Sequence, residues 1–262
     1  MSKYKLFAVI PARDARYVKE KIEEMESSGL PFVIVCGERI DHKNVVYRPP
    51  KGKYDAINYA IRFIPREAEI VIFNDVDTKI PDHNMIFKAI NLFNEDPAIG
   101  LIFGKDLVKE GPQVLFHRWL YAIIKRVPII VNGDIIFIRR VILQKLIPLP
   151  PCKAEDALLG FKVLELGYKV VFNEKCFVFT NKTGKEVEEI KYKRRTVGGI
   201  YQALSYCHSK GSSLLIVKMF YILLPLLLPF LLLTGKKGYC WFKGISLGIC
   251  DFLKKDNTGI WI

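Results

Sequence analysis

Short apolar runs alternate with longer amphipathic stretches in the N-terminal part of the chain. The apolar runs have the length of buried strands and cover residues 6–10, 32–35, 45–47, 70–73 and 99–103. The amphipathic stretches have the spacing of helices and cover residues 15–26, 54–64 and 82–93. This alternation predicts an α/β fold with a mostly parallel central sheet that helices cover on both faces.

The middle of the chain has a more mixed pattern. Apolar runs at residues 129–131 and 135–138 predict two strands joined by a short turn. A helix is expected to begin at Glu155-Asp156 and to end near Gly167, and residues 168–172 predict a further strand.

The C-terminal part contains a long apolar stretch at residues 214–233. Lys218 is the only strongly polar residue in it. The stretch is long enough to cross a bilayer, although Pro225 and Pro229 would bend a helix there. Basic residues flank it on both sides, so a single crossing would leave one basic group outside, against the positive-inside tendency. We expect a re-entrant or interface-lying segment; a transmembrane helix and a buried oligomer contact are the alternatives.

The expected organisation is a catalytic domain over residues 1–210 and a membrane-associated segment over residues 211–262, with an amphipathic part at 239–253. The apolar run at residues 6–10 is too short for a signal peptide and is stopped by Pro11, so it predicts a buried first strand. The catalytic domain is therefore expected at the cytoplasmic face of the cell membrane.

The net charge of the chain indicates the chemical class of its binding partner but not its identity. The chain has 40 Lys and Arg against 27 Asp and Glu, a formal net charge of +13, which indicates an anionic partner such as lipid headgroups, phosphorylated substrates or nucleic acid. No nucleic-acid-binding motif is present, and the basic residues are spread along the chain, so nucleic acid is not expected. The six cysteines lack CxxC spacing and are expected to be reduced thiols.

Two carboxylates follow the apolar run at residues 70–73. Asp75 and Asp77 lie one residue apart, where the carboxyl end of a buried strand would place them at a ligand-binding edge. Oxygen ligands suit a hard dication such as Mg²⁺, which also bridges to substrate phosphates. An Asp-x-Asp pair in a solvated loop is the alternative, because such pairs are common.

Two predicted helix starts carry charged groups. Gly52 permits a tight turn, and Lys53 offers a point charge for a phosphate at a helix N-terminus, although no P-loop motif is present. Glu155 and Asp156 open another helix. They either stabilise the helix start through the helix dipole, or one of them acts as a general base.

Cations gather before a glycine pair near the end of the predicted catalytic domain. The run Lys191-Tyr192-Lys193-Arg194-Arg195 precedes Gly198 and Gly199. Such a run forms a solvated or membrane-proximal face, or it binds a diphosphate leaving group.

The order of these elements resembles the family 2 glycosyltransferases of GT-A fold, over about residues 4–210. The matching segments are Ile10-Pro11-Ala12-Arg13-Asp14, Gly52 to Asn58, Asp75-Val76-Asp77-Thr78, Gly133 to Arg140, Glu155-Asp156 and Arg194-Arg195. The Gly133 to Arg140 segment resembles the one that lines the acceptor side in that family. Single motifs are weak, but their combination in this order is specific.

The resemblance implies roles for particular residues. Asp77 would bind Mg²⁺ or Mn²⁺ with help from Asp75, and Asp156, supported by Glu155, would deprotonate the acceptor and give inversion. The residues implied to contact the nucleotide-sugar donor are Pro11, Arg13, Glu38, Lys53, Asp75, Arg194 and Arg195.

Two departures from the family pattern affect these roles. Cys36-Gly37-Glu38-Arg39 stands where Asp-Asp-Gly-Ser is usual, which leaves the nucleotide open. The Gln and Trp of the usual arginine motif are absent beside Arg194 and Arg195, which argues against a processive polymer synthase.

The predicted function is transfer of a sugar from a nucleoside-diphosphate sugar to a lipid-linked or membrane-proximal acceptor. One alternative is a sugar nucleotidyltransferase, although the glycine-rich loop expected after Pro11-Ala12-Arg13 is missing. The others are a non-catalytic, basic, peripheral membrane-binding protein and a glycosyltransferase fold that has lost catalysis.

Overall fold

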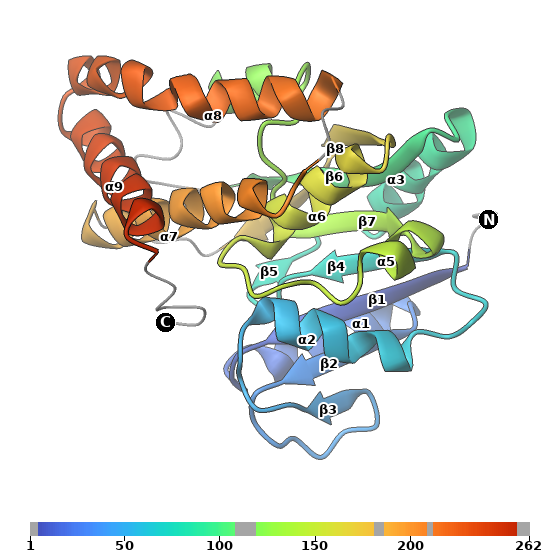
Figure 1. Cartoon of the computed structure of the whole chain (residues 1–262). Coiled ribbons are helices and arrows are strands. Elements are labelled where there is room, and N and C mark those ends of the chain that lie inside the picture. Colours follow the sequence, from blue (N-terminus) through green and yellow to red (C-terminus); the bar gives the residue numbers. More distant parts are fainter. Residues whose placement is uncertain (1–4, 108–118, 181–185, 209–211, 256–262) are drawn as a thin grey trace.

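A mixed β-sheet forms the centre of the molecule (Figure 1). The computed structural model describes residues 5–107, 119–180, 186–208 and 212–255. Within these ranges the sheet has eight strands in the order β3-β2-β1-β4-β7-β6-β8-β5. Their bounds are β1 Leu6–Ala12, β2 Phe32–Cys36, β3 Val45–Tyr47, β4 Ile70–Asn74, β5 Thr78–Lys79, β6 Ile99–Leu107, β7 Ile135–Arg139 and β8 Lys169–Thr180.

Strand direction decides which residues meet at one edge of the sheet. The strands β1 to β4 are mutually parallel, with Ala8 beside Phe32 and Phe7 beside Val71. The strand β7 runs antiparallel to both of its neighbours, so that Ile135 at its start pairs with Asn74 at the end of β4. The strand β6 is again parallel to β8. The starts of β7 and the ends of β4, β6 and β8 therefore lie at the same edge.

Helices cover both faces of the sheet because the strands are apolar on both faces. Alternate residues of β1 and β4 enter two separate cores, Val9 and Val71 on one face and Ile10 and Ile72 on the other. The helices that cover the sheet are α1 Val18–Ser28 and α3 Asn84–Glu95 on one face, and α2 Lys53–Ala60 with the short 3-10 helix Ile61–Phe63, α5 Arg140–Leu146 and α6 Glu155–Glu165 on the other. Figure 1 shows α2 and α5 in front of the sheet and α1 behind it.

The predicted α/β fold is confirmed, and the N-terminal strands and helices lie where the apolar periodicity placed them. The strand predicted at residues 129–131 is wrong, because this segment has no ladder partner in the structure. Ile129 and Val131 are buried by packing, and the missing Cβ of Gly160 on α6 leaves the space that the Val131 side chain fills. The strand predicted at residues 168–172 is longer than expected and continues as β8 to Thr180.

Three long helices complete the described chain: α7 Glu186–Ser205, α8 Ser212–Leu231, which ends in a 3-10 turn at Leu232–Thr234, and α9 Lys236–Leu253. Figure 1 shows α8 lying across one end of the molecule and α9 returning to α7. Leu214 and Val217 of α8 are fully buried and belong to the same core as the sheet, and the Tyr221 hydroxyl donates to the carbonyl of Ile129 at 3.0 Å. The division of the chain near residue 210 stays a prediction, and α8 packs directly on the domain that precedes it.

Candidate active site

The predicted site residues gather at the edge of the sheet described above. A cavity of about 490 Å³ opens there, between the ends of β1 and β4, the starts of α2 and α6, and one side of α7. Eight of the ten predicted site residues line it: Pro11, Arg13, Lys53, Asp75, Asp77, Glu155, Asp156 and Arg195. The tertiary structure thus brings together side chains that are up to 184 positions apart in the chain, from Pro11 to Arg195.

The turn after β4 presents Asp75 and Asp77 to this cavity. The backbone N–H of Thr78 and its hydroxyl both donate to the carbonyl of Asp75, at 3.2 and 2.8 Å. The N–H of Asp75 donates to the carbonyl of Asp134, at 3.3 Å, across the β4–β7 pair. These bonds satisfy the polar backbone where the strand ends and hold the turn against β7.

Lys53 connects this turn to α6. Its ammonium lies 2.7 Å from Oδ1 of Asp75 and 3.0 Å from Oε1 of Glu155. Burial would lower the pKa of Lys53, but the charges of Asp75, Glu155 and Asp156 raise it well above its usual value. Lys53 is therefore charged, and its contact with a donor phosphate stays a prediction.

Asp156 is half-buried at the start of α6 beside these charges, next to the buried Glu155. Burial and the neighbouring Glu155 carboxylate raise the pKa of Asp156 to about 7, whereas Lys53 and the N–H of Ala157 act in the opposite direction. The Ala157 N–H donates to Oδ1 of Asp156 at 2.8 Å. A carboxyl group with such a pKa can accept or release a proton near neutral pH.

Gly133 allows Asp156 and Lys53 to approach each other. A Cβ at this position would lie 2.7 Å from Oδ2 of Asp156 and 3.1 Å from Nζ of Lys53. Any side chain there would displace the carboxylate or the ammonium, so the glycine in the Gly133 to Arg140 segment is a steric requirement of the site.

Two predicted residues lie away from the cavity wall. Arg194 forms a bidentate ion pair with Asp251 on α9, at 2.6 and 2.8 Å, whereas its neighbour Arg195 faces the cavity. Glu38 accepts a hydrogen bond from the backbone N–H of Ala15 at 3.3 Å and does not line the cavity. Neither position supports the donor contact that was expected of it.

The structure adds polar residues that the sequence pattern did not single out as site residues. Asp106 and Asp134 are buried and line the cavity, and the Tyr121 hydroxyl donates to the Asp106 carboxylate. Asp134 lies in the Gly133 to Arg140 segment, but only the antiparallel direction of β7 places it beside Asp75. Nothing in the sequence marked Asp106. The cations that also line the cavity, besides Arg13, Lys53 and Arg195, are Arg16, Lys153 and Lys193.

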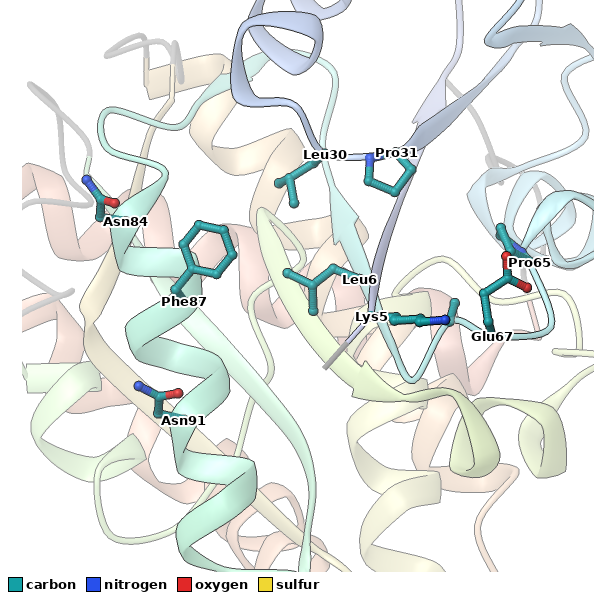
Figure 2. A pocket seen from close by; sticks show the side chains of 10 residues that line it. Lys5, Leu6, Leu30, Pro31, Pro65, Glu67, Asn84, Phe87 and Asn91 are labelled. Atoms are coloured by element: carbon teal, nitrogen blue, oxygen red, sulfur yellow. The ribbon is translucent and has the colours of Figure 1, made fainter. Parts of the chain in front are cut away.

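A larger cavity, of about 810 Å³, lies at the opposite, amino-terminal edge of the strands (Figure 2). Figure 2 shows Phe87 of α3 facing Leu6 and Leu30, with Lys5 and Glu67 near the start of β1. Its lining contains none of the predicted site residues. The smaller cavity, where paired carboxylates and cations converge, is therefore the candidate active site.

The residues of the smaller cavity fit a divalent cation that arrives with a phosphate ligand. Asp75 and Asp77 offer the oxygen donors that Mg²⁺ and Mn²⁺ prefer. Among the residues that the structure describes, no group of three or more His, Cys, Asp or Glu side chains is placed to hold a metal ion. Two carboxylates make a partial ligand set, which diphosphate oxygens and water would complete.

Solved structures share this fold, whereas no protein-family model and no curated protein sequence matches the chain. The mannosyltransferase PcManGT from Pyrobaculum calidifontis, in complex with GDP-Man and Mn²⁺, superimposes with a TM-score of 0.76 at 18% identity, covering 98% of this chain and 89% of that one. Glucosyl-3-phosphoglycerate synthase from Mycobacterium tuberculosis, in complex with Mn²⁺, UDP-glucose and phosphoglyceric acid, gives 0.56 at 17% identity, covering 77% of this chain and 80% of that one.

These similarities establish the GT-A fold, as the sequence motifs predicted. The similar proteins are glycosyltransferases whose structures hold nucleotide sugars together with Mn²⁺. A further complex of the M. tuberculosis enzyme, with Mg²⁺ and UDP, has a TM-score of 0.56 at 15% identity, covering 80% of this chain and 82% of that one.

Proposed function

We propose that this chain is a metal-dependent, inverting glycosyltransferase that moves a sugar from a nucleoside-diphosphate sugar to an acceptor at a membrane surface. One observation carries the proposal: Asp75, Asp77 and Asp156 line a single cavity in a GT-A fold, and Lys53 links the two acidic segments by ion pairs of 2.7 and 3.0 Å. The proteins of similar structure, which are glycosyltransferases in complex with Mn²⁺, support it.

On the donor side, Asp75 and Asp77 would hold Mg²⁺ or Mn²⁺ against the diphosphate. A metal ion bound there supplies Lewis-acid stabilisation of the charge that develops on the leaving group. Arg195 and Arg13 both line this cavity, where their positive charges would offset the negative charge of a departing nucleoside diphosphate. We assign no donor contact to Arg194, since Asp251 binds its guanidinium.

On the acceptor side, Asp156 would accept the proton of an acceptor hydroxyl as the acceptor oxygen attacks the anomeric carbon. The bond from that carbon to the diphosphate oxygen breaks, and the leaving group retains the electron pair. Because a single displacement occurs, the configuration at the anomeric carbon inverts. An acceptor that attacks through a phosphate oxygen needs no base, so the effect of an Asp156 substitution would distinguish the two acceptor chemistries.

Glu155 and Lys53 would maintain the charge balance on which Asp156 depends. Glu155 holds the Lys53 ammonium at 3.0 Å, and that ammonium also contacts Asp75. Lys53 therefore couples the charge at the metal-binding turn to the charge at the base. This arrangement limits repulsion among carboxylates in a partly desolvated site.

The apolar surface of α8 supports a membrane-proximal acceptor. In the described part of the chain, Ser212–Thr234 is the one helix long and apolar enough to cross a bilayer, by length and composition. Its exposed side chains include Ile222, Leu226 and Phe230, each at least 65% exposed. Because Leu214 and Val217 pack into the core, we propose that α8 lies in the membrane interface with its free face in lipid.

The apolar side of the cavity supports a lipid-linked acceptor. Leu120, Ile124 and Ile130 also line the cavity, and Ile124 belongs to the same core as Leu214 and Val217 of α8. An amphiphilic acceptor would thus place its polar group near Asp156 and its apolar part toward α8. Exposed lysines of α9 and of the turn that follows it, such as Lys236, Lys237 and Lys254, favour an anionic, cytoplasmic leaflet.

Nucleotide binding separates this proposal from its alternatives. Calorimetric titrations of the full chain with UDP, GDP, CDP and dTDP, each with Mn²⁺ and with a chelator, should show metal-dependent binding of one diphosphate. The Asp77→Ala variant should lose that binding. A non-catalytic membrane-binding protein would bind none of them, and a nucleotidyltransferase would bind a nucleoside triphosphate in preference to the diphosphate.

A further inference from the structure

A buried lysine lies directly behind the turn that carries Asp75 and Asp77. Lys21 is on α1, and its side chain is 1% exposed. A fully buried lysine is rare, because an ammonium removed from water is stable only when all of its N–H groups find acceptors. Lys21 does not line the cavity, whereas Asp75, Val76 and Asp77 do.

The three N–H groups of the ammonium have three acceptors. Nζ of Lys21 donates to Oδ1 of Asn74 at 2.8 Å and to the carbonyl of Thr78. It also forms an ion pair with the carboxylate of Glu24, at 3.2 Å. These contacts use the full donor capacity of a lysine side chain.

Asn74 and Thr78 are the residues that flank the turn on either side. The amide of Asn74 donates to the Thr78 hydroxyl at 2.8 Å and to the carbonyl of Asp134 at 2.7 Å. The Thr78 hydroxyl in turn donates to the carbonyl of Asp75 at 2.8 Å. Lys21 therefore closes a network that contains both ends of the turn and its connection to β7.

The charge of Lys21 acts on the same turn. Burial lowers the pKa of Lys21, whereas Glu24, Asp75 and Asp77 raise it. A positive charge behind the turn reduces the repulsion between the two aspartates before a cation arrives. Its hydrogen bonds fix the backbone from which both carboxylates project.

We propose that Lys21 is a positioning residue that holds the Asp75–Thr78 turn in the conformation that binds a divalent cation. This inference rests on the proposed function in that Asp75 and Asp77 are taken as the metal ligands. Lys21 contacts neither the metal nor the substrate. It acts through Asn74 and Thr78.

The test is the affinity for Mn²⁺ itself, measured by the electron paramagnetic resonance signal of free Mn²⁺ with UDP or GDP present. Lys21→Met keeps the length of the apolar stem of the side chain and removes the ammonium. We expect its apparent Kd for Mn²⁺ to rise about tenfold or more, as is usual when a residue that supports metal ligands is lost. In assays, the Mn²⁺ concentration for half-maximal rate should rise by the same factor, while kcat at saturating Mn²⁺ stays close to that of the wild type.

Glu24→Gln is the matched control. It removes the ionic partner of Lys21 but keeps the contacts of Lys21 with Asn74 and Thr78, so thermal stability should fall while the Kd for Mn²⁺ changes by less than about twofold. If Lys21→Met does not fold, the double variant Lys21→Met/Glu24→Met removes the buried pair together and should show the same loss of Mn²⁺ affinity.

A folded Lys21→Met or double variant that binds Mn²⁺ as tightly as the wild type would overturn the inference and leave the proposed function intact. A wild-type chain that shows no Mn²⁺-dependent nucleotide binding would instead overturn the proposed function. The two failures are therefore distinguishable in one set of titrations.

Discussion

Single residues in the cavity depend on one another through charge, and Asp156 shows this most directly. Its carboxyl group faces Glu155, Lys53 and Asp75 and accepts a bond from the Ala157 N–H, and burial with the Glu155 charge raises its pKa to about 7. A base must be ionised to accept a proton. We therefore expect kcat/KM to fall as the pH drops below about 7.

Asp156→Asn should lower kcat by roughly 10²- to 10⁴-fold toward a hydroxyl acceptor, because the general base is lost. The same variant should unfold at a higher temperature at pH 8. A carboxyl group whose pKa is raised by folding destabilises the folded state at any pH above the pKa that the group has in the unfolded chain. A neutral amide avoids that cost. Thermal scans beside the rate measurements separate lost chemistry from lost folding.

Glu155→Gln is the control for the pH dependence. Removing the Glu155 charge removes a cause of the raised pKa of Asp156 and leaves Lys53 with less neutralisation, so the acid limb of the pH profile should move to lower pH. An acid limb that stays in place or moves to higher pH would show that Asp156 is not the group that titrates.

At the scale of elements, α7 connects the cavity to the C-terminal helices. Arg195 and Thr196 of α7 line the cavity, and α9 packs on the same helix through glycines. A Cβ on Gly248 would lie 2.6 Å from the carbonyl oxygen of Arg194 and 2.9 Å from the backbone N of Gly198. The Arg194–Asp251 ion pair lies beside this contact and reinforces it.

Gly248→Ala should therefore separate the two helices, lower the free energy of unfolding by about 1–3 kcal/mol and weaken donor binding through the shift of α7. Chemical denaturation and nucleotide titration measure the two effects. Cys250→Ala, at an exposed position on α9, is the control and should leave both unchanged. Wild-type stability in Gly248→Ala would show that the α7–α9 contact adjusts without strain.

At the scale of the whole molecule, α8 presents one face to the core and another to the surroundings. A truncation near residue 210 would remove Leu214 and Val217 from the core as well as the exposed apolar face. Substitutions on the exposed face alone are the cleaner test of membrane association.

The double variant Ile222→Asp/Leu226→Asp should bind anionic phospholipid vesicles at least about tenfold more weakly, because two exposed apolar side chains become charged at the proposed lipid contact. Vesicle co-sedimentation measures this, and nucleotide binding should not change. Val141→Asp, at an apolar position 60% exposed on α5, is the matched control. Equal vesicle binding by the double variant and the control would exclude α8 as the membrane contact.

Much of the fold and the core of the site follows from local rules. The strands of the N-terminal half were predictable because buried strands need continuous apolar runs, and α6 because acids favour a helix start. Asp75 and Asp77 were predictable as a pair because they directly follow such a run, and a residue after a parallel strand lies at the ligand-binding edge.

Other features depend on packing that no local pattern records. The run at residues 129–131 is apolar like a strand, but its side chains pack against α6 and α8, and the hydroxyl of Tyr221 donates to the carbonyl of Ile129 in place of a neighbouring strand. Arg194 and Arg195 are adjacent in sequence, but successive residues of a helix point about 100° apart, so that one binds α9 and the other faces the cavity.

The sequence by itself determined the α/β pattern, the acidic pair after β4 and the acidic start of α6, because short-range periodicity and helix-end chemistry specify these. Only the tertiary structure decided that the half-buried Asp156 lies beside Glu155 and Lys53, that the antiparallel β7 places Asp134 beside Asp75, and that Lys21 lies behind the Asp75–Thr78 turn. Burial, strand direction and long-range charge are properties of the folded chain, and they set the chemistry of its residues.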